Sequence, residues 1–81
     1  MITENKRAIP KARKIIGSAV VLDGPLNIRK KPNTDAEIVG QTQKGQRFNV
    51  TEGSTTDFTA IIYKDEVRYA MTKYLDVTTN S

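Results

Sequence analysis

The sequence predicts a small all-β domain, and three observations support that fold class. The stretch Leu26–Arg29 alternates apolar and polar residues, as a strand with one buried face does. Turn-forming residues then recur at short intervals, at Pro32-Asn33, Gly40 and Gly45. No apolar pattern of helical period extends over ten residues. Because 81 residues hold one domain at most, we expect a single small barrel or sandwich.

The N-terminal part divides into a polar arm and a first strand. Residues 1–14 are polar and basic, so we expect a flexible arm or linker. The apolar pair Ile15-Ile16 is expected to dock on the domain as a short strand, before a break at Gly17-Ser18. The run Ala19–Leu22 predicts the next strand, which ends at the turn signal Asp23-Gly24-Pro25.

The middle of the chain predicts three strands with polar connections. After Leu26–Arg29, the loop Asn33-Thr34-Asp35 leads to a strand at Glu37–Thr42. A turn at Gln43-Lys44-Gly45 precedes the cleanly alternating strand Arg47–Thr51. A further polar loop, Glu52 to Asp57, then closes this part of the sequence.

The C-terminal part predicts a hairpin and a closing strand. Phe58–Tyr63 is rich in β-forming residues, and a tight turn at Lys64-Asp65-Glu66 connects it to a strand at Val67–Ala70. One 3₁₀ turn is expected at Met71-Thr72-Lys73, before the strand Tyr74–Val77. The whole pattern gives five to seven short antiparallel strands.

The net charge of +4 is placed unevenly along the chain. Residues 1–17 carry five basic side chains against one acidic, whereas residues 18–81 carry eight of each sign. The basic residues of the arm are Lys6, Arg7, Lys11, Arg13 and Lys14. We therefore expect a basic arm at 1–17, a neutral barrel at 18–77 and a frayed end at 78–81. The arm is either a solvated linker or a contact with a weakly bound anionic partner, and it lacks aromatic residues for base stacking.

The composition argues against catalysis. The chain has no His and no Cys, which excludes Ser-His and Cys-His nucleophile pairs and any disulfide. The adjacent carboxylates Asp65 and Glu66 lie on a turn, where they point apart into water. We therefore expect no enzyme, no catalytic residues, no metal site and no cofactor.

Localisation stays open at this stage. No apolar run is long enough to cross a membrane, and charged residues with Pro10 occupy the place of a signal peptide's apolar segment. A cytoplasmic protein, a virion component and a piece of an exported protein all fit these observations.

The motifs in order resemble the bacterial SH3-like (SH3b) family over about residues 18–77. The matching elements are Leu26-Asn27-Ile28-Arg29, Pro32, Ile38-Val39-Gly40, Lys44-Gly45, Tyr69-Ala70 and Tyr74-Leu75. The chain departs from the family pattern at Phe58, which stands in place of a Trp, and at Asp57 and Arg68, which replace glycines. The resemblance implies a small SH3-like barrel and a module that binds a ligand.

The resemblance also implies a ligand groove built from aromatic residues and neighbouring loops. Its candidate residues here are Asn27, Arg29, Tyr63 and Tyr69. Tyrosines suit such a groove because they offer both stacking area and a hydroxyl. The alternative is structural: Asn27 bonds nearby backbone, Arg29 pairs with Glu37 or Asp35, and the tyrosines pack at the edge of the core.

A second candidate surface lies on the strand Phe58–Tyr63, whose two faces are both apolar. Alignment with the family places Ile61 in the core, so Phe58 and Ile62 are expected to face outward. Either a β-bulge or the arm with Ile15-Ile16 covers this stripe, or Phe58 and Ile62 form a protein interface.

Three function classes follow. The leading hypothesis is a non-enzymatic binding module of a bacterium or phage that attaches to a cell-wall or envelope component or to a protein partner. The second is a structural or assembly protein that uses the Phe58–Ile62 face. The third is nucleic-acid binding through the basic arm.

Overall fold

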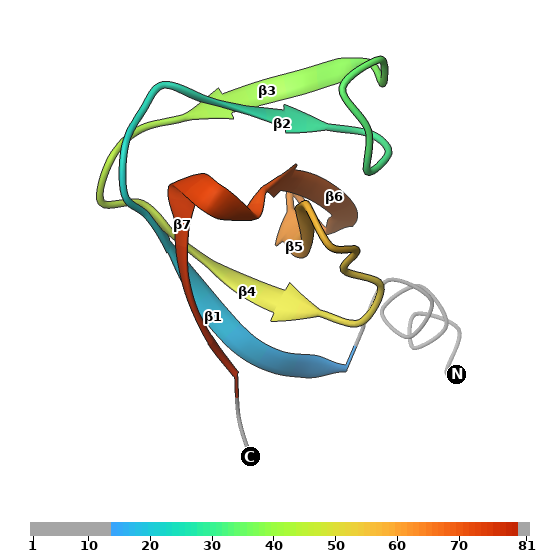
Figure 1. The fold of residues 1–81 in the computed structure, drawn as a ribbon. Coiled ribbons are helices and arrows are strands. Elements are labelled where there is room, and N and C mark those ends of the chain that lie inside the picture. The colour runs from blue at the N-terminus through green and yellow to red at the C-terminus, as the bar shows by residue number, and fades with distance from the viewer. Residues whose placement is uncertain (1–13, 80–81) are drawn as a thin grey trace, which may run out of the picture.

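The computed structural model describes residues 14–79 and contains seven strands (Figure 1). Of the predicted arm at residues 1–17 it describes residues 14–17, with Lys14 as their one basic residue. The expectations for Lys6, Arg7, Lys11 and Arg13 therefore lie outside the described residues, as does the end of the chain from residue 80. The strands are β1 (Ile15–Val21), β2 (Leu26–Arg29), β3 (Ile38–Thr42), β4 (Arg47–Thr51), β5 (Phe58–Tyr63), β6 (Glu66–Met71) and β7 (Leu75–Thr79). A 3₁₀ turn, η1 (Thr72–Tyr74), connects β6 to β7.

The seven strands form one sheet in the order β3-β2-β6-β5-β4-β1-β7. The paired neighbours are antiparallel, and the sheet curls around a common interior (Figure 1). This architecture confirms the predicted all-β fold and agrees with an SH3-like barrel. Within residues 14–79 there is no helix with the length and apolar character needed to cross a membrane.

The interior is filled by short aliphatic side chains from six of the strands, and an outer ring of partly buried residues packs against them. The buried cluster is Ala19, Val21, Leu26, Ile28, Val50, Ile61, Ala70 and Leu75. The outer ring is Ile16, Val39, Phe48, Tyr63, Tyr74 and Val77. Ile61 is completely buried, as the family alignment predicted.

Strand β1 is continuous, so the predicted break at Gly17-Ser18 is wrong. Gly17 pairs with Val50 of β4 and with Thr79 of β7, and the register slips by one residue between Ile15 and Gly17. A side chain at position 17 would meet the β7 backbone, with a Cβ only 2.8 Å from the Cα of Thr79. Glycine at this position therefore admits close backbone approach instead of ending the strand.

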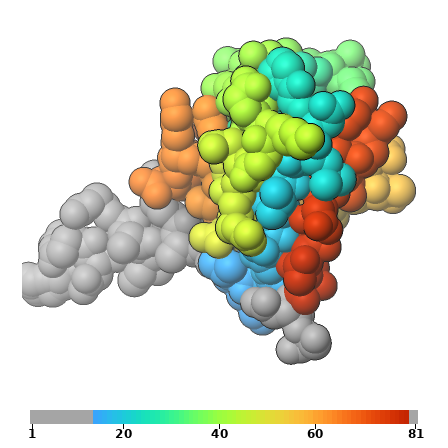
Figure 2. Space-filling model, turned by 90° about the vertical axis from the view of Figure 1, so that its left-hand side faces the viewer, coloured from blue at the N-terminus to red at the C-terminus, as the bar shows by residue number. Residues whose placement is uncertain are grey.

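The hairpin between β5 and β6 turns at Lys64 and Asp65, next to the pair Tyr63–Glu66. Both turn residues have positive φ, 51° and 67°. That conformation matches a two-residue hairpin turn with the twist of the flanking strands. The hairpin, orange in Figure 2, projects from the body of the barrel.

Candidate functional site

Strands β2, β6 and β5 present a shared outer face. Arg29 pairs with Tyr69, and Tyr69 in turn pairs with Ala60. Directly paired residues project to the same side of a sheet, and side chains alternate along each strand. The outer face, as used below, therefore comprises Asn27, Arg29, Phe58, Ala60, Ile62, Val67, Tyr69 and Met71.

Tyr63 lies on the opposite side of β5, toward the interior. Its ring centroid is 6.2 Å from that of Phe48, at an interplanar angle of 58°. Its hydroxyl stands over Gly40, where a Cβ would meet the ring at Cζ, 2.8 Å away. The structure thus brings Asn27, Arg29 and Tyr69 to one face, whereas Tyr63 packs at the edge of the core.

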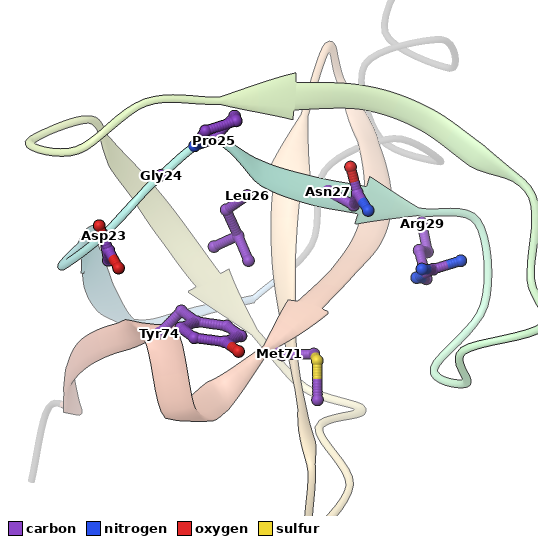
Figure 3. A pocket seen from close by; sticks show the side chains of 8 residues that line it. All are labelled: Asp23, Gly24, Pro25, Leu26, Asn27, Arg29, Met71 and Tyr74. Atoms are coloured by element: carbon purple, nitrogen blue, oxygen red, sulfur yellow. The ribbon is translucent and has the colours of Figure 1, made fainter.

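A groove of about 390 Å³, called the Tyr74 groove below, lies beside the outer face. It lies between the β1–β2 turn, strand β2 and η1 (Figure 3). Its lining residues are Asp23, Gly24, Pro25, Leu26, Asn27, Arg29, Met71 and Tyr74. Two of the predicted ligand residues, Asn27 and Arg29, therefore line it.

The Tyr74 groove has charged ends and an apolar floor. Asp23 and Arg29 stand at opposite ends of the hollow, and Leu26 points from β2 toward the Tyr74 ring, with Met71 beside it (Figure 3). The ammonium of Lys73 also lies 5.3 Å from the centre of the Tyr74 ring. Such a groove suits a short chain that carries both signs of charge and some apolar surface.

The polar residues of the groove are held by neighbours other than those expected. Arg29 donates from Nη1 to the carbonyl of Ala36 at 2.9 Å, so the predicted pairing with Asp35 or Glu37 is wrong for this contact. The Asn27 Oδ1 accepts a hydrogen bond from the Gln41 side chain, also at 2.9 Å, instead of bonding nearby backbone. These bonds leave the other guanidinium N–H groups and the Asn27 amide N–H₂ available to a ligand.

A second hollow of about 360 Å³, called the loop hollow below, adjoins the outer face. Its walls are the β2–β3 and β4–β5 loops, which lie on the same side of the barrel (Figure 1). Its lining residues are Pro32, Asn33, Thr34, Thr55, Thr56, Asp57 and Phe58. The side chains of this hollow are mostly hydroxyl, amide and carboxylate groups.

The β4–β5 loop explains why both faces of β5 are apolar. The Ser54 hydroxyl accepts a hydrogen bond from the Ala60 N–H at 2.9 Å, and Thr55 exchanges two bonds with Phe58. The loop therefore folds back over the outer side of β5. Phe58 lies on the outer face, as expected, but its ring is covered and only 5% exposed, while Ile62 is half-buried.

Tyr69 lines a third hollow, of about 320 Å³, where the chain enters the barrel. The other lining residues are Lys14, Thr51, Glu52 and Val67. The buried Thr51 hydroxyl donates to the Lys14 carbonyl at 2.7 Å and fixes this entry point. Tyr69 thus lies on the outer face but outside the Tyr74 groove.

Sequence reasoning missed Asp23 and Met71 as groove residues and placed Tyr74 only at the start of the closing strand. Asp23 lies in a turn signal, and Met71 was expected in a 3₁₀ turn. The register places Met71 two residues beyond Tyr69 on β6, opposite the Asn27 end of β2. No group of three or more His, Cys, Asp or Glu residues that could hold a metal ion occurs in the part of the chain that the structure describes.

Comparison with known families gives one match. A family model described as a bacterial SH3 domain matches residues 24–76, which is more than half of the chain. The matched segment contains seven of the eight residues of the Tyr74 groove and all of the loop hollow. A search of curated proteins found no match.

Proposed function

The chain belongs to the bacterial SH3 domain family, and we propose that it is a non-enzymatic module that binds a short peptide of the bacterial cell wall or envelope in the Tyr74 groove. Domains of this family are generally binding modules. One fold serves many functions, so the choice of ligand rests on the groove itself.

The observation that carries the proposal is the pairing of opposite charges across an apolar floor. Asp23 and Arg29 bound the groove at its two ends. A cell-wall peptide carries free carboxylates and, where it contains a diamino acid, a free amine. Its amine would meet the Asp23 carboxylate and its carboxylate the Arg29 guanidinium, which can bind a carboxylate with two parallel hydrogen bonds.

The middle of the groove supports the same ligand. Leu26, Met71 and the Tyr74 ring offer apolar contact for the aliphatic part of a short peptide. The free amide N–H₂ of Asn27 can donate to a peptide carbonyl. Because Arg29 is already bonded to Ala36, little side-chain freedom is lost when a ligand binds.

Retention on purified cell walls tests the proposal. The whole chain is mixed with walls from a Gram-positive and a Gram-negative bacterium, and the bound fraction is measured after sedimentation. We expect the wild type to sediment with at least one of them. A wild type that stays in the supernatant with both would overturn the proposal.

Charge variants then locate the site. The double variant Asp23→Asn/Arg29→Gln removes both charges and keeps polar side chains of similar shape, so we expect at least tenfold weaker binding. The matched control Asp76→Asn/Arg47→Gln removes the same two charges from exposed positions on β7 and β4. Equal binding by the two double variants, with unchanged circular dichroism, would exclude the Tyr74 groove.

A further inference from the structure

We propose that the open edge of β7 pairs with β7 of a second copy of this chain, in an antiparallel register centred on Val77. The product is a twofold-symmetric dimer whose sheet continues from one copy into the other. Strand β7 contributes no residue to the Tyr74 groove, so the inference goes beyond the proposed function and does not depend on it.

Strand β7 forms one end of the sheet, and its outer side is open. It pairs with β1 in an unbroken register from Val21–Leu75 to Gly17–Thr79, and with no other strand among residues 14–79. Figure 2 shows β7, in red, at the molecular surface beside β1, in blue. An unpaired edge of this kind presents a row of backbone donors and acceptors to which a further strand can be added.

The other end of the sheet, β3, is less suited to such pairing. Its register with β2 slips between Ile28 and Arg29, which marks a bulge or irregularity. A bulge bends and twists an edge and disfavours the addition of a strand. The pairing of β7 with β1 shows no such slip, so β7 is the edge that can accept a full strand.

Alternate residues of β7 direct their backbone groups to the open side. The Leu22 N–H donates to the Tyr74 carbonyl at 2.9 Å, so this pair, just before β7, is a hydrogen-bonded one. The Val21 N–H donates the other way, to the Gln46 carbonyl beside β4. In an antiparallel pair the two kinds of residue alternate. The residues whose backbone groups point away from β1 are therefore Leu75, Val77 and Thr79.

These outward groups are complementary to themselves. The Leu75 N–H is already used, since it donates to the Thr72 carbonyl, but the Leu75 carbonyl faces the edge. In the proposed pairing the Val77 N–H of each copy donates to the Val77 carbonyl of the other. The Thr79 N–H of each copy donates to the Leu75 carbonyl of the other. The edge thus finds its donors and acceptors in a second β7.

The side chains favour the register centred on Val77. It places the partly buried Val77 of each copy side by side and sets each exposed Asp76 opposite an exposed Thr78, whose hydroxyl can donate to the carboxylate. A register centred on Asp76 would oppose two carboxylates, which is destabilising. A register centred on Thr78 would leave Leu75 and Asp76 opposite no residue of β7.

Sedimentation equilibrium of the whole chain tests for the dimer. A pair of five-residue strands buries less than the area of about 1,200 Å² typical of stable interfaces, so we expect a dissociation constant on the order of 100 µM. The mass should rise from monomer toward dimer with concentration, and the amide chemical shifts of Val77 and Thr79 should change over the same range. A mass that stays monomeric up to about tenfold above that constant, or association without these shifts, would overturn the inference.

Opposite charges at position 78 test the register. Thr78→Lys places an ammonium opposite Asp76 of the other copy, so we expect dimerisation about threefold tighter, whereas Thr78→Asp should weaken it by about as much. The net charge of +4 acts in the reverse direction, because an added Lys increases the repulsion between two basic chains. In an Asp76→Asn background, Thr78→Lys should bring no gain. A weaker dimer with Thr78→Lys than with Thr78→Asp would overturn the register.

A backbone variant tests the edge itself. Thr79→Pro removes an N–H that faces the open side and places a ring there, which an edge strand tolerates within its own sheet. We expect this variant to stay monomeric, while the matched control Thr79→Val keeps the N–H and the dimer. Circular dichroism checks that both keep the barrel, and the position 78 variants decide if Thr79→Pro does not. Equal dimerisation of the two folded variants would overturn pairing through β7.

Discussion

The two faces of the β5–β6 hairpin differ in how they are covered. The inner face packs against the barrel: Ile61 is completely buried, and Tyr63 contacts Phe48 and Gly40. The outer face is covered in part by the polar β4–β5 loop and is hollowed elsewhere, beside Met71 and Tyr69. One face of this strand pair thus packs in the core, and the other contributes to the groove that we propose as a binding site.

The neighbours Ile61 and Ile62 test most directly whether the inner and outer faces differ in their contribution to stability. Ile61→Ala should lower the free energy of unfolding by about 3 kcal/mol, since it opens a cavity in a closed core. Ile62→Ala should lower it by about 1 kcal/mol, because that side chain is half-buried and its site can be filled by solvent. Urea unfolding of both variants measures the difference.

Both losses are measured relative to the wild-type chain. The slope of the unfolding free energy against urea concentration should be the same in all three proteins. Equal losses at positions 61 and 62 would show that the outer face contributes as much packing as the inner one.

The inner face can be tested further at Gly40. Gly40→Ala would place a methyl group against the Tyr63 ring, which is held by Phe48 and the core. We expect a loss of about 2 kcal/mol in thermal or urea unfolding, typical of overpacking.

A double-mutant cycle assigns that loss to the ring. In a Tyr63→Ala background, Gly40→Ala should cost less than about 0.5 kcal/mol, because the two sites would no longer be coupled. A full loss in that background would place the strain in the β3 backbone instead.

Two buried threonines differ in whether their hydroxyl has a hydrogen-bond partner. The Thr42 Oγ1 is buried and has no hydrogen-bond partner within the described residues, whereas the Thr51 Oγ1 donates to the Lys14 carbonyl. Thr42→Val should raise the free energy of unfolding by about 1 kcal/mol, and Thr51→Val should lower it by about the same amount. Unfolding of both variants in guanidinium chloride measures the change in the free energy of unfolding for each. Two changes of the same sign would contradict this explanation.

Local sequence patterns predicted most of the strands and the buried position of Ile61. Alternation located β2 and β4, and the family motif placed Ile61 in the core. The Tyr74 groove was not predicted, because Asp23 and Met71 are far apart in sequence and meet only through the pairing of β2 with β6. Pairing register is set by the whole sheet and is not encoded in any one segment.

The β4–β5 loop, which covers the outer side of β5, could not be identified as a cover from the sequence. The two-sided apolar pattern of Phe58–Tyr63 left open whether a β-bulge, the arm with Ile15-Ile16 or a protein partner accounts for the apolar outer side. The covering segment was not identified, since Glu52 to Asp57 is polar and predicted a simple loop. Its hydroxyls bond the β5 backbone, and such side-chain bonds depend on tertiary placement.

The smallest expected effect lies at the turn that joins the two strands. Lys64 and Asp65 both have positive φ, a conformation that side chains other than Asn and Gly adopt at a cost. Lys64→Asn/Asp65→Gly should therefore raise the free energy of unfolding by about 0.5 kcal/mol, after allowing for the greater freedom of glycine in the unfolded chain. The exposed contact of the Lys64 ammonium with the Tyr63 ring, 5.4 Å from its centre, is lost in this variant and offsets part of the gain. The turn lies outside the Tyr74 groove and the loop hollow, so retention on cell walls should stay at the wild-type level. A loss of retention would show that the binding surface extends to the tip of the hairpin.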